Sequence, residues 1–148
     1  MKIYPITALL LTGILLVTGC TKNMKQINEE VDKFHRHYNQ GEYSTIYYAS
    51  GKEYQKATSV SKHNDFFNLV NKALGRYQSK QQTKYNTHYQ NGINTVTVIY
   101  QSKFERGEGE ELFVFLQDKR KNYRLIHYNV NTKEFLKYGE EFYKVLYE

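Results

Sequence analysis

The chain has 148 residues, with one Cys, one Pro, no Trp, 15 Tyr and a formal charge of +6 at pH 7. This length accommodates one domain, and a single Cys excludes an internal disulfide framework and a Cys-based zinc cluster. The apolar content of 40% excludes a wholly disordered chain, and no apolar run reaches the roughly 18 residues that a membrane-spanning helix needs.

The N-terminal segment has the pattern of a secretory signal peptide. Lys2 precedes an apolar stretch over residues 6–17, and the stretch ends in the sequence Val-Thr-Gly-Cys at residues 17–20. This sequence closely resembles the lipobox of bacterial lipoproteins, in which the Cys thiol receives a diacylglycerol. The resemblance implies that a lipoprotein signal peptide, residues 1–19, is cleaved between Gly19 and Cys20. The alternative is an ordinary secretory signal with a chance Cys, or a buried free thiol.

Lipidation of Cys20 would anchor the mature chain to a bacterial membrane, because two or three acyl chains give stable attachment. Residues 20–25 then form a lipidated tether that keeps the domain close to this membrane. Thr21 stands where an Asp favours inner-membrane retention in many Gram-negative bacteria, so we expect the outer membrane, facing the periplasm, if the host is Gram-negative. Removing Lys2 lowers the formal charge from +6 to +5, which favours an anionic membrane slightly and gives no argument for nucleic acid.

Residues 26–148 are predicted to form one domain that begins with helices. Apolar side chains recur every three or four residues after Gln26, which is typical of an amphipathic helix. The predicted helices are 26–40, ending at Gly41; 43–49; and 62–74, between the N-cap Ser61 and the terminating Gly75. Residues 53–58 have no clear pattern.

After Gly75 the apolar period falls from about 3.6 to 2, which indicates strands. Asn91-Gly92 predicts a tight hairpin turn, and we expect the next turn at residues 107–109. Residues 112–116 are continuously apolar and predict a central strand. The predicted strands are 76–89, 93–104, 111–117 and 123–130.

In the last of these strands, alternation places Tyr123 and Leu125 toward the core. It places Arg124, Ile126 and Tyr128 on the other face. Residues 132–148 fit either a C-terminal helix or a segment lying across the sheet.

Helices followed by sequential strands predict an α+β fold with helices on one face of a curved four-stranded antiparallel meander. The helix that ends near Gly41, the Tyr-rich residues 46–48, the helix end at residues 73–75 and the last strand at Tyr123 resemble small exported bacterial domains with cystatin-like or NTF2-like folds. The resemblance covers residues 26–130. Related folds include enzymes such as ketosteroid isomerase, but no catalytic motif matches, and a fold alone does not define a function.

No catalytic residue, metal site or cofactor is predicted. His35 and His37 lie two apart on a helix and point away from each other, and the remaining histidines are isolated in sequence, so we expect histidines at the surface or half-buried. Four acids could attract a divalent cation, but they lack calcium-loop spacing, and we expect a solvated acidic hairpin. These acids are Glu105, Glu108, Glu110 and Glu111.

The tyrosines suggest a contact surface, because Tyr is amphipathic and enriched at interfaces. The candidate binding face consists of Tyr77, Tyr85, Tyr89, Tyr100 and Tyr128. The alternative is that these tyrosines fill and rim a small core.

Our leading hypothesis is a non-enzymatic, membrane-anchored envelope lipoprotein that binds another envelope protein, in an immunity, inhibitor or assembly role. A small-ligand carrier with a cone-shaped pocket is the alternative, and an enzyme using Tyr and His is third.

Overall fold

The computed structural model describes residues 18–147, with the backbone alone at positions 18–21, 142 and 146. The predicted signal peptide lies outside these residues except for the backbone of its last two positions. The side chain of Cys20, the predicted lipidation site, also lies outside them.

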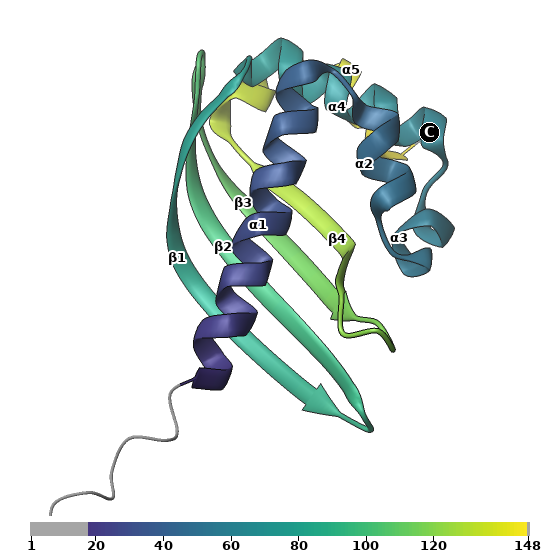
Figure 1. Ribbon diagram of the computed structural model, residues 1–148. Helices are drawn as coiled ribbons and strands as arrows, with labels where there is room; N and C mark the ends of the chain where they lie inside the picture. The colour runs from purple at the N-terminus through teal and green to yellow at the C-terminus, as the bar shows by residue number, and fades with distance from the viewer. Residues whose placement is uncertain (1–17, 148) are drawn as a thin grey trace, which may run out of the picture.

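The described chain is an α+β domain with helices before a four-stranded sheet (Figure 1). All strand pairs are antiparallel, in the order β1-β2-β3-β4, which confirms the predicted meander. A short C-terminal helix follows the sheet. The elements are α1 (Thr18–Gln40), α2 (Tyr43–Ala49), α3 (Lys52–Ala57), α4 (Val60–Leu74), β1 (Tyr77–Gln90), β2 (Ile93–Phe104), β3 (Gly107–Gln117), β4 (Tyr123–Asn131), the 3₁₀ helix η1 (Lys133–Tyr138) and α5 (Gly139–Tyr147).

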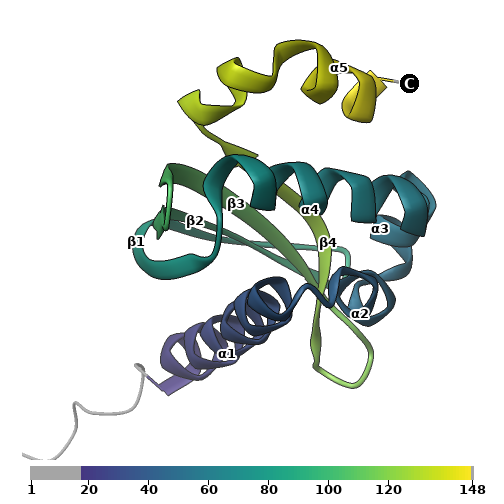
Figure 2. The same ribbon diagram turned by 90° about the horizontal axis from the view of Figure 1, so that it is seen from above.

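The helices are arranged around a curved sheet. Helix α1 lies along the concave face of the sheet, and α4 crosses one end of the sheet (Figure 1). Helix α5 lies beyond α4, on the side away from α1 (Figure 2). The concave face is therefore covered by α1, while β1 forms an open edge of the sheet.

Helix α1 is fixed to the sheet by its apolar stripe. Ile27, Val31, Phe34 and Tyr38 are all buried, as the period of the sequence predicts. The helix begins at Thr18 rather than Gln26, so the backbone of the expected tether, from position 20 to 25, is helical.

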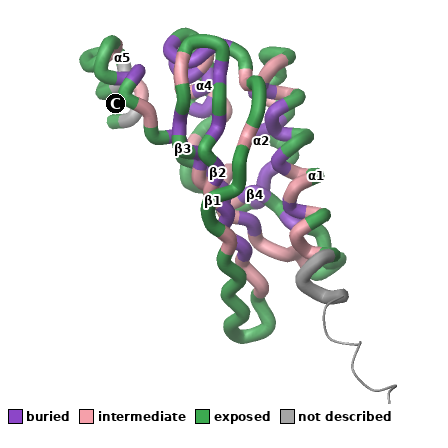
Figure 3. The backbone as a smooth tube through the Cα atoms, turned by 90° about the vertical axis from the view of Figure 1, so that its left-hand side faces the viewer, coloured by how far each residue is buried: buried purple, intermediate pink, exposed green. Residues whose placement is uncertain are grey.

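Residue alternation places the inner face of β2 in the core. Val96, Val98 and Tyr100 are buried there, between the inner faces of β1 and β3. Burial is concentrated near the helices, whereas the far end of the β1–β2 hairpin is mostly exposed (Figure 3). The hairpin turn is at Asn91-Gly92, where both residues have positive φ (53° and 79°), as a type I′ turn requires.

Further boundaries differ from the sequence predictions. The patternless residues around Tyr54 form α3. Helix α4 is capped by Ser59, whose hydroxyl accepts the Lys62 N–H, rather than by Ser61. The β2–β3 turn is at Glu105-Arg106 rather than at residues 107–109, because Glu105 N–H and Arg106 N–H donate to carbonyls that precede β1.

The predicted faces of β4 are wrong beyond Leu125. Phe115 pairs with Leu125 and Val114 with His127, so Ile126 is an extra residue in β4. Such a bulge reverses the alternation that follows it. Tyr128 therefore lies on the buried face with Leu125 rather than opposite to it.

Candidate functional site

The tyrosines predicted as a binding face do not share one exposed surface. Tyr100 and Tyr128 are buried. Tyr77 and Tyr85 are half-buried and pack against the core. Tyr89 alone of the five is well exposed, at 73%. The structure therefore does not gather these residues into one binding face, and Tyr89 is the strongest contact candidate among them.

A buried polar network lies where α1 meets β3 and β4. Glu111 of β3 is 1% exposed. Its Oε2 lies 2.9 Å from Nε2 of His35, and its Oε1 accepts a hydrogen bond of 2.7 Å from the Tyr128 hydroxyl. Tyr77 stacks on the His35 ring with centroids 3.6 Å apart. The expectations that Glu111 belongs to a solvated hairpin and that His35 lies near the surface are both wrong.

The sequence contains a signal for this network. Glu111, Phe113 and Phe115 alternate along β3 and therefore share one face. His35 is four residues after Val31, so it lies beside the apolar stripe of α1. The predicted turn at residues 107–109 is two residues too late, and it therefore groups Glu111 with the acidic turn.

Burial acts to raise the pKa of Glu111, but the charge and hydrogen bond of His35 and the Tyr128 hydroxyl together hold this pKa below its usual value. Glu111 is therefore an ionised carboxylate at neutral pH, buried and paired. Carboxylate, imidazole and phenol are the groups of acid–base catalysis. A substrate cannot reach Glu111 through its 1% exposure, however. The geometry fits a role in holding α1 against the sheet.

A second polar cluster is centred on His63 in α4, which is also buried. Its Nε2 lies 2.8 Å from the Tyr43 carbonyl, and its Nδ1 lies 2.9 Å from the Tyr54 hydroxyl. A carbonyl only accepts, so Nε2 carries the proton and Nδ1 accepts from Tyr54. Burial lowers the pKa of His63 to about 4, against the opposing effect of the Tyr43 carbonyl. His63 is therefore neutral at pH 7.

An open groove of about 400 Å³ runs past this cluster, between α3, α4, β4 and α5. Its walls combine aromatic and aliphatic side chains with polar ones, and the polar ones are Thr58, Lys62, His63, His127 and Asn129. This volume is within the range of small-molecule sites. The other lining side chains include Phe66, Ile126, Tyr128 and Val145.

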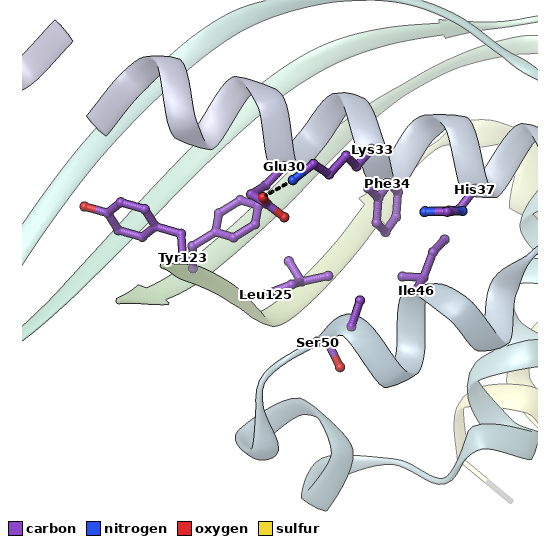
Figure 4. A pocket seen from close by; sticks show the side chains of 10 residues that line it. Glu30, Lys33, Phe34, His37, Ile46, Ser50, Tyr123 and Leu125 are labelled. Carbon is purple, nitrogen blue, oxygen red and sulfur yellow. Dashed lines mark hydrogen bonds and ion pairs between the residues drawn. The ribbon is translucent and has the colours of Figure 1, made fainter. Parts of the chain in front are cut away.

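A smaller pocket of about 70 Å³ lies between α1, α2 and β4 (Figure 4). Phe34, Ile46 and Leu125 form apolar walls, and the ion pair between Lys33 and Glu30 (2.6 Å) lies at its rim. This volume is well below that of typical ligand sites, which begin at about 300 Å³. The pocket is large enough for a single side chain.

The outer edge of β1 is the longer of the two strand edges of the sheet, and at its start the Asn39 side chain bonds the N–H and the C=O of Tyr77 (2.7 and 2.9 Å). β1 spans Tyr77–Gln90, 14 residues, and among the described strands it pairs only with β2. Most of its side chains are exposed. Unpaired N–H and C=O groups along such an edge can pair with another strand.

Within residues 18–147, no group of three or more His, Cys, Asp and Glu side chains is arranged to hold a metal ion. None of the helices described is both long and apolar enough to cross a membrane.

No protein family, curated protein or solved structure matches the chain significantly. The function must therefore be argued from the geometry and from the sequence.

Proposed function

We propose that the chain is a membrane-anchored lipoprotein of the bacterial cell envelope that acts as a non-enzymatic protein-binding module. Immunity, inhibition and assembly are roles that such a module serves. The sequence Val-Thr-Gly-Cys at residues 17–20 supports lipid attachment at Cys20. The helices packed on the concave side of a curved meander support a cystatin-like or NTF2-like fold for the domain.

The open edge of β1 is the main observation that supports the proposed binding role. An extended segment of another protein could add a strand to this edge, with main-chain hydrogen bonds giving affinity and side chains giving specificity. Residues 77–90 contain Lys80 and Lys84 and no acidic residue. Lys80 is already ion-paired with Asp32 of α1, so exposed Lys84 supplies the charge that favours a partner segment with acidic side chains. A second copy pairing through the same edge would bring like charges together.

The closed interior argues against an enzyme. The carboxylate best placed for acid–base chemistry, Glu111, is sealed beneath α1 and paired with His35 and Tyr128. A protein-binding surface on the outside of the sheet does not require access to this interior.

The test is site-specific photocross-linking of the full chain in intact cells of its own host. A photoreactive amino acid is placed at Gln81 or Asn86, both exposed on β1, and at exposed Asn68 on α4 as the matched control. We expect one envelope protein cross-linked from both β1 positions and not from Asn68. Absence of any adduct at the β1 positions, with normal protein levels, would refute the binding role of this edge.

A small-ligand carrier is the second candidate, and the groove beside Tyr54 and His63 favours it because of its volume of about 400 Å³. Native mass spectrometry of the full chain, purified gently from its host, tests this candidate. A reproducible added mass that is lost on enlarging Ala57, which lines the groove, to Trp would favour the carrier. A bare protein mass, with no thermal shift from a ligand library, would leave only the protein-binding role.

A further inference from the structure

We infer that the end of the domain where α1 begins is a second membrane contact, in which a basic surface and the β1–β2 hairpin tip meet an anionic lipid surface. This inference rests on the proposed attachment at Cys20, and it adds a defined orientation of the domain on the membrane.

Three segments far apart in sequence lie at this end. The start of α1, the tip of the β1–β2 hairpin and the β3–β4 turn all lie toward the bottom of the molecule in Figure 1, and the first two are seen there again in Figure 3. The Gln26 side chain of α1 donates to the carbonyl of Lys121 in the β3–β4 turn (3.4 Å). A lipid on Cys20 would therefore bring all three segments toward the membrane.

The charges at this end are almost all positive. Residues 18–28, 84–95 and 119–124 contain seven Lys and Arg and no acidic residue. The neighbouring carboxylate, Asp118, accepts the N–H groups of Arg120 and Asn122 (2.8 and 2.9 Å) and pairs with Arg124 (3.7 Å), so this end still has an excess of positive charge. The seven basic residues are Lys22, Lys25, Lys84, Lys119, Arg120, Lys121 and Arg124, and all are exposed.

The opposite end carries no such excess of positive charge. The β2–β3 turn, η1 and α5 lie there (Figure 1). Residues 105–110 and 132–147 contain six acidic residues and four Lys and Arg, and Lys72 and Lys103 pair with two of these acids, Glu141 and Glu108. An anionic surface would therefore attract the end that carries Cys20 more strongly than the other, which turns the domain in one direction.

The hairpin tip has the side chains for the interfacial layer. Tyr89 and Ile93 flank the Asn91-Gly92 turn and are 73% and 53% exposed. An aromatic ring with a polar tip is favoured at the headgroup level of a bilayer. The positive φ angles of Asn91 and Gly92 fix the turn that holds the two side chains at the end of the hairpin.

The test uses the absence of Trp from the chain. A Tyr89→Trp variant of the full, lipidated chain is reconstituted in vesicles of phosphatidylcholine, either alone or with about 30% phosphatidylglycerol to give an anionic surface. On anionic vesicles we expect a blue-shifted indole emission that brominated lipids quench. Tyr143→Trp, on exposed α5 at the other end, is the matched control and should show neither effect.

A charge-reversed variant separates the surface contact from the lipid anchor. Lys119→Glu, Arg120→Glu and Lys121→Glu are combined with Tyr89→Trp. Each basic residue near an anionic surface changes binding about fivefold, so three substitutions should weaken the surface-contacting state at least a hundredfold, or about 3 kcal/mol. We expect loss of quenching while the protein still sediments with the vesicles.

Intact mass distinguishes failure of this inference from failure of the proposed anchor. A lipidated, vesicle-bound Tyr89→Trp protein whose emission is the same on neutral and anionic vesicles refutes the second contact alone. A chain that carries no diacylglycerol refutes the anchor and, with it, the orientation.

Discussion

The buried imidazole of His63 predicts a loss of stability in mild acid. In the folded protein its pKa is lowered from 6.5 to about 4 by burial. The unfolded chain therefore binds a proton between these two pH values when the folded protein does not. By linkage, the free energy of unfolding rises with pH in this window and is lost as the pH falls from about 6.5 toward 4.

The magnitude follows from the difference between the two pKa values. At about 1.4 kcal/mol per pH unit, the fall from 6.5 to about 4 corresponds to about 3 kcal/mol. Linkage places about 2 kcal/mol of this loss between pH 7 and 5. Typical domains are stable by only about 5–15 kcal/mol, so a loss of this size is measurable.

Urea unfolding followed by circular dichroism at pH 7, 6 and 5 measures the loss. His63→Gln is the matched variant, because an amide can still donate to the Tyr43 carbonyl and accept from Tyr54 but does not titrate in this range. We expect this variant to be less stable at pH 7 and to lose less stability on acidification than the original chain. NMR titration of the His63 ring proton measures the pKa of His63 directly. The signal is assigned by its absence from the spectrum of His63→Gln.

Two results would refute this reasoning. A His63 ring that titrates near 6.5 in the folded protein would mean that the ring is hydrated. Equal losses of stability in the original chain and in His63→Gln between pH 7 and 5 would assign the acid sensitivity to other groups.

Three further substitutions test the interior. Tyr128→Phe removes a hydrogen bond to a buried carboxylate and should lower the free energy of unfolding by about 2 kcal/mol. The control, exposed Tyr89→Phe, should change this free energy by less than about 0.5 kcal/mol. Equal free energies of unfolding in urea for the original chain and Tyr128→Phe would contradict the network. Gly75 has φ +76°, and a Cβ added there would lie 2.8 Å from Glu105 Oε2. Gly75→Ala should therefore lower the free energy of unfolding by about 1–2 kcal/mol. Gly139→Ala, where a Cβ meets open space, should not lower it. The pKa of Glu111 in the folded protein is below its ordinary 4.5. Ionisation of Glu111 therefore stabilises the fold above pH 4.5, and this contribution is lost as the pH falls through the folded pKa. The stability gap between the original chain and Glu111→Gln should therefore narrow below pH 4.5, and a gap that stays constant there would mean that folding does not lower the pKa of Glu111.

Local signals in the sequence are sufficient for the four strands and for helices α2 and α4, but not for α3. The Asn91-Gly92 turn and strand β2 each depend on neighbouring residues, and the structure has both where the sequence predicts them. Helix α2 likewise spans the predicted residues 43–49. Short-range patterns of this kind are set by backbone sterics and by residue periodicity.

The side-chain placements that failed depend on contacts between distant segments. The bulge at Ile126 is coupled to the approach of β4 to the loop after α2, where the Gly51 N–H donates to the Leu125 carbonyl (2.8 Å). Nothing in the residues around Ile126 marks this contact, and one extra residue is enough to move Tyr128 from the outer face to the core. In the same way, Glu111 became buried because His35, 76 residues earlier, provides a partner for its charge.

The buried network also limits where recognition can occur. A curved sheet with helices on its concave side offers a natural site between the two layers, but here α1 fills that space with an apolar stripe. Beside this stripe, buried His35 is paired with buried Glu111. Removing either partner would leave the other charged or polar group buried without its pair, at a cost of several kcal/mol. Opening this interior to a substrate is therefore opposed by the same contacts that hold α1 in place. The surfaces that remain available are peripheral, and two of them differ in chemistry: the polar edge of β1 suits a protein strand, and the basic end at α1 suits an anionic membrane.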